Sequence, residues 1–168
     1  RYVESLLQQH DISYIKTREP GGTSVGEAIR KVFKTHDPDE PLDAKTELLL
    51  LYAGRLQHIE YKIKPALAQG KWVLCDRFEL STLAYQVAGR GLDIDFVKIL
   101  SAYCVGDFKP DMTLFLDIPP AQGLERVKAR GAIDRIEHEG LSFFQKVDAG
   151  YQSQIKNMPS VFKINAAL

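Results

Sequence analysis

The chain of 168 residues contains little cysteine, carries no excess of either charge and has no long apolar run. Its two cysteines, Cys75 and Cys104, are too few for a disulfide framework, and their apolar surroundings favour buried, reduced thiols. Lys plus Arg and Asp plus Glu number 22 each, so net charge gives no general attraction to nucleic acid or to an anionic membrane. No signal peptide or membrane-spanning segment is evident. We therefore expect one cytoplasmic domain that binds neither nucleic acid nor membrane.

The sequence also lacks the Walker phosphate-binding motif, Gly-x-x-x-x-Gly-Lys-Ser/Thr. It has instead the turn REPGGT at 18–23, which follows an apolar run and precedes a helical pattern. The first residues already follow helical spacing, and the last, VFKINAAL, stop soon after a strand-like run. We expect that both ends of the natural protein are missing from this sequence.

Four short apolar runs predict strands at 12–17, 72–75, 112–117 and 161–164, and helical patterns separate them. This alternation predicts an α/β domain with a parallel sheet. An acidic, proline-containing loop at 35–43 precedes a long helical pattern that Pro65 should kink and Gly70 should end.

Charged residues follow three of the predicted strands, where open parallel sheets bind their ligands. They are Arg18 with Glu19, Asp76 with Arg77, and Asp117. Acids and arginines together indicate a site for an anion with a metal ion. Ordinary strand-end polarity is the alternative, and it is favoured for Asp117, which has no basic neighbour.

One arginine, Arg55, interrupts an apolar helical stripe formed by Leu48, Leu51, Tyr52 and Ile59. Burying a guanidinium without a partner is costly. Arg55 therefore either extends to water or points into a pocket and meets a polar ligand.

The segment DRFELSTLAYQ at 76–86 combines phosphate-binding and base-reading side chains. Asp76 can hold a cation or water near a phosphate, and Arg77 can bind a phosphate in bidentate fashion. Thr82 and Gln86 share one helical face and could read the edge of a base, while Tyr85 could pack on a sugar. The alternative is an amphipathic helix whose polar face meets solvent.

Three arginines, Arg126, Arg130 and Arg135, mark a basic segment at 125–137. A mobile flap of this kind can close over a transferring phosphoryl group and stabilise the charge that develops on it. The alternative is a solvated charged helix. The four histidines have no ligand spacing, and we assign none of them to metal binding or catalysis.

Several of these segments occur in the order and spacing of a known family: TREPGGT, YAGRLQHI, CDRFELSTLAYQ, FKPDMTLFLDIPP and ARGAIDRIE. Together they resemble bacterial thymidylate kinase in the form that carries its arginines in the flap. The resemblance implies transfer of the ATP γ-phosphate to dTMP, which gives dTDP for dTTP biosynthesis. It also implies Mg²⁺, a homodimer and a three-layer P-loop nucleoside-monophosphate-kinase fold with a parallel sheet. The single domain would span 1–168, with a flap at about 126–140, and would lack the first strand and the P-loop.

The resemblance also implies roles for individual residues. Arg77 would bind the dTMP phosphate, and Asp76 would lie near Mg²⁺ and the phosphates. Arg130 and Arg135 would be the catalytic flap arginines, with Arg126 and Arg130 on the ATP side. The acceptor pocket would consist of Glu19, Pro20, Arg30, Leu51, Arg55, Arg77, Ser81, Thr82, Tyr85 and Gln86.

Two departures from the family pattern have consequences. Leu51 occupies a position where the family often has a Phe that stacks on thymine. The leucine weakens that stacking. The absent strand lies inside the family's sheet, so two neighbouring strands should expose unpaired backbone. A nucleotide-binding protein without catalysis and a deoxynucleoside kinase are the alternative functions.

Overall fold

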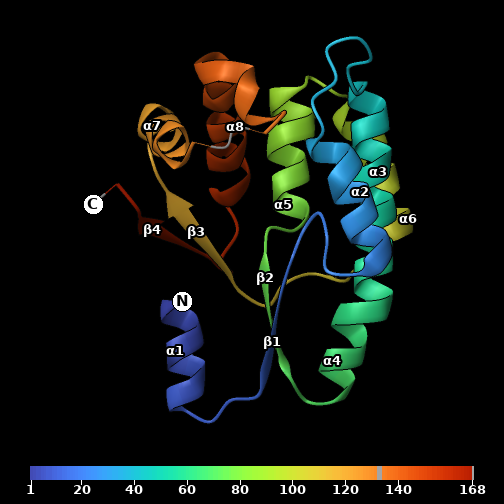
Figure 1. Cartoon of the computed structure of the whole chain (residues 1–168). Coiled ribbons are helices and arrows are strands. Elements are labelled where there is room, and N and C mark those ends of the chain that lie inside the picture. The colour runs from blue at the N-terminus through green and yellow to red at the C-terminus, as the bar shows by residue number, and fades with distance from the viewer. Residues whose placement is uncertain (132–133, 168) are drawn as a thin grey trace.

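The computed structural model describes residues 1–131 and 134–167. Helices and strands alternate along the chain, as the sequence predicts (Figure 1). In chain order the elements are α1 (Tyr2–Gln9), β1 (Tyr14–Arg18), α2 (Ser24–Lys34), α3 (Ala44–His58), η1 (Ile59–Ile63), α4 (Lys64–Ala68), β2 (Trp72–Asp76), α5 (Glu79–Thr82), η2 (Leu83–Gly89), α6 (Ile94–Cys104), β3 (Thr113–Asp117), α7 (Pro120–Arg130), η3 (Glu137–Glu139), α8 (Gly140–Ile155) and β4 (Val161–Asn165).

All four predicted strands form, and they pair in parallel. The pairing of β1 with β2 runs from Tyr14 opposite Trp72 to Arg18 opposite Asp76. The pairing of β3 with β4 runs from Thr113 opposite Val161 to Asp117 opposite Asn165. Within the described residues the pairs are separate sheets, so β2 and β3 each have a single strand partner. This arrangement agrees with the expectation that two strands expose unpaired backbone.

The long helical pattern after the acidic loop is confirmed, and so is its interruption near Pro65. The carboxylate of Asp43 caps α3 by accepting hydrogen bonds from the N–H groups of Lys45 and Thr46, at 2.9 and 3.2 Å. The helix then passes through the π-helical segment η1 into α4, whose first turn contains Pro65. Proline has no N–H for the α-helical ladder, so the change of hydrogen bonding falls directly before it.

The core lies where the helices meet the flap segment. One cluster joins residues from α2, α3, η2, the flap and α8: Phe33, Leu51, Ala84, Ile136, Phe143 and Val147. A second joins α3 and α6 through Leu48, Tyr52 and Val97. In Figure 1, α2, α3 and α6 stand side by side, and α8 lies next to the helix that follows β2. Over residues 1–131 and 134–167, no helix combines the length and apolar character that crossing a membrane requires.

Candidate active site

The REPGGT turn is tied to the start of α2. The carboxylate of Glu27 accepts hydrogen bonds from Arg18 Nη2, at 3.0 and 2.9 Å, and from the N–H of Gly22, at 2.9 Å. The Gly22 N–H, together with the charge of Arg18, lowers the pKa of Glu27. Arg30 Nη1 donates to the carbonyl of Pro20 at 2.9 Å. The turn is therefore held by residues of β1 and α2.

Gly22 brings this turn into direct contact with buried side chains. It has a φ of +82°, and an added Cβ would lie 2.5 Å from Thr17 Oγ1 and 2.6 Å from the His58 ring. A larger residue would therefore collide with β1 and α3 as well as strain the backbone. The glycines allow the turn to pack closely on the interior, and no phosphate is needed to explain them.

Arg55 points into the interior, so the alternative of an arginine extended to water is wrong, while its contact with a ligand in a pocket stays a prediction. Only 3% of the residue is exposed. Its Nε donates to Glu19 Oε2 at 2.8 Å, and its Nη2 donates to Thr82 Oγ1 at 2.9 Å. The rings of Tyr52 and Phe78 lie 5.1 and 5.3 Å from the guanidinium carbon.

The third nitrogen of this guanidinium, Nη1, is buried and makes no hydrogen bond. It is the one buried side-chain nitrogen or oxygen without a partner in the described part of the chain. Buried donors are almost always satisfied, because leaving one unpaired costs about 1–3 kcal/mol. An acceptor brought by a ligand would satisfy this donor.

Behind Arg55 lies a chain of buried hydrogen bonds. Glu19 Oε1 contacts His58 Nδ1 at 3.0 Å, and His58 Nε2 contacts Thr17 Oγ1 at 2.6 Å. The three residues are 6%, 0% and 7% exposed. Glu19 therefore connects Arg55 of α3 to the strand that precedes the glycine turn.

Arg77 lies at the end of β2 in a left-handed backbone conformation with a φ of 70°. Its guanidinium carbon is 5.0 Å from the centre of the Tyr85 ring, which packs edge-on against Tyr151. Ser81 Oγ is 2.7 Å from the Tyr151 hydroxyl. A residue other than glycine adopts this backbone only under constraint, and such strain clusters at functional sites. Asp76 and Arg77 are both exposed at this strand end.

Thr82 and Gln86 turn inward rather than toward solvent. They are 1% and 2% exposed, so the alternative of a solvated polar face is wrong for both. Gln86 Nε2 donates to Glu47 Oε1 at 2.6 Å. The same carboxylate, through Oε2, accepts from Arg135 Nη2 at 2.5 Å and from Arg90 Nη2 at 3.2 Å.

The predicted flap arginines occupy different surroundings. Arg135 is 7% exposed, and its Nε donates to the Phe33 carbonyl at 2.9 Å. Arg130 Nη2 donates to Glu137 Oε1 at 2.6 Å, and Arg126 Nη1 donates to the Ala166 carbonyl at 2.9 Å. Residues 132 and 133 of the predicted flap lie outside the described residues, as does residue 168. The structure thus shows Arg135 paired with Glu47, away from solvent, and Arg126 and Arg130 exposed.

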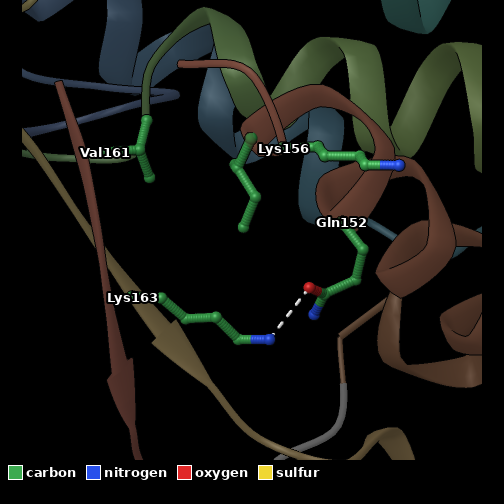
Figure 2. Close-up of a pocket in the computed structure, with 5 residues that line it drawn as sticks. Gln152, Lys156, Val161 and Lys163 are labelled. Carbon is green, nitrogen blue, oxygen red and sulfur yellow. Dashed lines mark hydrogen bonds between the residues drawn. The ribbon is translucent and has the colours of Figure 1, made fainter. Parts of the chain in front are cut away.

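Two surface cavities lie apart from the acceptor residues. One, of about 270 Å³, is lined by Gln152, Ile155, Lys156, Val161 and Lys163, and contains none of the predicted site residues (Figure 2). Its Lys163 already contacts Gln152 Oε1 at 3.0 Å and Asp117 at 3.1 Å, so its charge is balanced. The other is an open hollow of about 430 Å³ on α7, and Arg126 lines it.

The described residues contain no group of three or more His, Cys, Asp or Glu side chains that could hold a metal ion. Mg²⁺ in phosphoryl-transfer sites is usually held by one or two carboxylates together with substrate phosphates and water. The exposed carboxylate of Asp76 fits that requirement. Asp117, in contrast, accepts from Gln152 at 2.9 Å and pairs with Lys163, as ordinary strand-end polarity predicts.

Glu47 and His58 are the residues of this site that the sequence reasoning missed. Glu47, Leu51, Arg55 and His58 follow one another at intervals of four, four and three residues, so they share one face of α3. Glu47 and His58, the polar residues at the two ends of this stripe, were the signal in the sequence that could have identified them. Their partners come from β1, η2 and the flap, which spacing along one helix does not reveal.

Comparison with known proteins places these features in a family. Residues 1–168 match the family model of thymidylate kinase. The thymidylate kinase of Legionella pneumophila (strain Corby) is 51% identical over 164 residues, which are 98% of this chain and 77% of the relative. That of Colwellia psychrerythraea (strain 34H / ATCC BAA-681) is 48% identical over 165 residues, 98% of this chain and 78% of the relative.

A crystal structure of thymidylate kinase from Ehrlichia chaffeensis matches with a TM-score of 0.74 and 31% identity. The match covers 97% of this chain and 81% of that chain. The predicted α/β nucleoside-monophosphate-kinase fold is thereby confirmed. The chain belongs to the thymidylate kinase family.

Proposed function

We propose that this protein transfers the γ-phosphate of ATP to dTMP and produces dTDP for dTTP biosynthesis. One observation carries the proposal beyond family membership: the buried, unpartnered Nη1 of Arg55. A guanidinium only donates, so its ligand must present an acceptor such as a carbonyl oxygen. Thymine has two carbonyl groups, whereas cytosine has an amino group in place of one of them.

The surroundings of Arg55 support recognition of a thymine edge. The Thr82 hydroxyl accepts from Arg55 Nη2, which leaves its own hydrogen to donate. Gln86 has its Nε2 committed to Glu47, which orients its Oε1 as the group free to accept an N–H. Thymine presents an N–H between its two carbonyls, so a row of donor and acceptor groups matches that edge. Leu51, in the core cluster beside these groups, provides an apolar wall.

We assign Arg77 and Arg30 to the phosphate end of dTMP, and Tyr85 to its sugar. Arg77 lies exposed at the carboxyl end of β2, where α/β folds bind ligands. Phosphoryl transfer needs positioning and charge neutralisation more than a covalent catalyst. Asp76 would hold Mg²⁺, which when bound neutralises charge on the phosphates.

The ATP side is assigned to Arg126 and Arg130 on α7. Both are exposed, so their guanidinium groups are accessible to a ligand. A direct contact of Arg135 with phosphate would require it to leave Glu47, at the cost of an unpaired buried carboxylate. We therefore assign to Arg135 chiefly the anchoring of the flap to α3.

A homodimer and a cytoplasmic location complete the proposal. Exposed apolar side chains repeat on three adjacent helices, namely Val25 and Val32 on α2, Leu49 and Leu56 on α3, and Phe96, Ile99 and Tyr103 on α6. Stripes of this kind support a protein–protein interface. The free thiols of Cys75 and Cys104 are typical of a reducing compartment.

A coupled assay of ADP release tests the proposed activity. The full-length protein is supplied with ATP and Mg²⁺ and, in turn, with dTMP, dUMP, dCMP and thymidine. We expect the highest kcat/KM with dTMP and little turnover of thymidine, because Arg77 and Arg30 supply charge for a phosphate already present. Turnover of thymidine above that of dTMP would indicate a nucleoside kinase, and no turnover at all would indicate a binding protein.

A further inference from the structure

The position of Arg55 Nη1 is determined by what holds the other two guanidinium nitrogens. Glu19 accepts from Nε, and Thr82 accepts from Nη2. The rings of Tyr52 and Phe78 lie close to the guanidinium carbon. A planar guanidinium bonded at two of its nitrogens has its third nitrogen fixed in the same plane. The aim of Nη1 therefore depends on the orientation of the Glu19 carboxylate.

His58 is what orients that carboxylate. Its Nδ1 lies 3.0 Å from Glu19 Oε1, on the carboxylate oxygen that Arg55 does not use. An ionised carboxylate only accepts hydrogen bonds, so Nδ1 carries the proton of this contact. On the other side of the ring, His58 Nε2 lies 2.6 Å from Thr17 Oγ1, within hydrogen-bond distance.

This series of hydrogen bonds ends beside the glycine turn. A Cβ on Gly22 would lie 2.6 Å from the His58 ring and 2.5 Å from Thr17 Oγ1, so the turn closes directly over the pair. His58 is 0% exposed and has no route to rotate away without displacing the turn. The turn, Thr17, His58 and Glu19 thus form one packed unit behind Arg55.

We propose that His58 is a positioning residue for the acceptor base: through Glu19 it aims Arg55 Nη1, and it thereby determines affinity for dTMP and discrimination against dCMP. The inference rests on the proposed function. Small displacements of a recognition group are costly, because sites require their groups to stay within about 0.5 Å of the productive geometry. Loss of the contact between His58 and Glu19 would leave the carboxylate, and with it the guanidinium, free to rotate.

Three substitutions of His58 separate its two contacts. In His58→Asn the amide nitrogen takes the place of Nδ1 and keeps a donor for Glu19, while the contact with Thr17 is lost. In His58→Gln the amide takes the place of Nε2, which keeps Thr17 and loses Glu19. His58→Leu loses both. His10→Gln, on the exposed end of α1, is the matched control.

Steady-state kinetics with dTMP, dCMP and ATP test the positioning role of His58. For His58→Gln and His58→Leu we expect the KM for dTMP to rise roughly tenfold, the loss expected from one charge-assisted hydrogen bond. The ratio of kcat/KM for dTMP over dCMP should fall with it, while the KM for ATP stays within about twofold. His58→Asn should recover most of the dTMP affinity, and His10→Gln should match the wild type.

Thr17→Val provides a second variant that keeps the shape of the side chain and removes only the hydroxyl. We expect a smaller rise of the KM for dTMP, about threefold, in line with a neutral hydrogen bond one step further from Arg55. Wild-type dTMP affinity and selectivity in both His58→Gln and Thr17→Val would overturn the positioning role and leave the kinase function standing. A wild-type protein that phosphorylates no dTMP would overturn the proposed function as well.

Discussion

At Arg77 the backbone conformation favours glycine, whereas the proposed phosphate contact requires arginine. A φ of 70° costs an arginine roughly 1–3 kcal/mol that glycine would not lose. The structure keeps arginine there and places its guanidinium against Tyr85. A residue retained against its own backbone preference is expected to serve the ligand rather than the fold.

The substitution Arg77→Gly separates these two effects. We expect the melting temperature to stay equal or rise, because glycine relieves the left-handed strain. We expect kcat/KM for dTMP to fall by roughly 100-fold or more, as for loss of a bidentate contact with phosphate. Thermal unfolding and the ADP-release assay measure the two quantities on the same sample. A stable Arg77→Gly protein with near-normal kcat/KM would refute the assignment of Arg77.

At the scale of elements, the flap is fastened to α3 and η2 through one carboxylate. Glu47 is fully buried and contacts Gln86, Arg90 and Arg135. Arg90 also forms an ion pair with Glu139 at the other end of the flap segment. Removing the Glu47 carboxylate would leave the buried Arg135 without its ion-pair partner and the Gln86 amide without its acceptor. The position of the flap base should therefore depend on Glu47.

The substitution Glu47→Ala should destabilise the fold by about 3–5 kcal/mol, the cost of uncompensated buried charge. In a double-mutant cycle with Arg135→Ala, the two effects should fall short of additivity by at least about 1 kcal/mol, because the residues share one ion pair. Urea unfolding measures both. Glu60→Ala is the control: its ion pair with Lys64 is exposed, and we expect a change below about 0.5 kcal/mol. Additive effects would show that Arg135 is held by other contacts.

The pH dependence of stability tests the contribution of Asp134, which lies in the flap segment. Partial burial alone would raise the pKa of Asp134, but the Lys34 ammonium and the N–H groups of Glu137 and Ile136 outweigh it, so the pKa is lowered. A lowered carboxyl pKa stabilises the fold above the unfolded value of about 4 and loses that effect as the pH falls through the folded value.

Asp134→Asn should therefore lower the free energy of unfolding at pH 7, and the difference from wild type should shrink below about pH 4. Urea unfolding at a series of pH values gives the comparison, and Asp95→Asn at an exposed position of α6 provides the control. A difference that stays constant from pH 7 to pH 3 would contradict the contribution of Asp134.

At the scale of the whole molecule, apolar side chains form exposed stripes on α2, α3 and α6, and the described residues do not cover them. On α6, Phe96, Ile99 and Tyr103 are 46%, 66% and 86% exposed, at a spacing that places them on one side of the helix. These three helices stand together at one side of the molecule (Figure 1). The homodimer proposed above would cover them.

We expect Ile99→Glu to shift the protein from dimer to monomer, because association would bury an unpaired carboxylate in an apolar interface. Sedimentation velocity over a range of protein concentrations measures the shift. Met158→Glu changes an exposed apolar residue between α8 and β4 and should leave the assembly unchanged. An Ile99→Glu protein that sediments as the wild type would place the interface elsewhere or show that none forms.

The sequence by itself determined those features that depend on neighbouring residues. Short apolar runs located the four strands, helical spacing located the long helix, and Pro65 located its π-helical interruption, because these patterns follow from local backbone geometry. The arginine in the apolar stripe of α3 stood out as a residue that either extends to water or faces a ligand pocket. Motif order and spacing were sufficient to predict the family.

The tertiary structure decided which buried polar groups meet. Glu47 and Arg135 are 88 positions apart in the chain, and Thr17 and His58 are 41 apart. Burial forces such groups to find partners, but packing of distant elements selects which partners they find. For the same reason the division of four parallel strands into two separate pairs, and the single unpaired nitrogen on Arg55, became visible only in the folded chain.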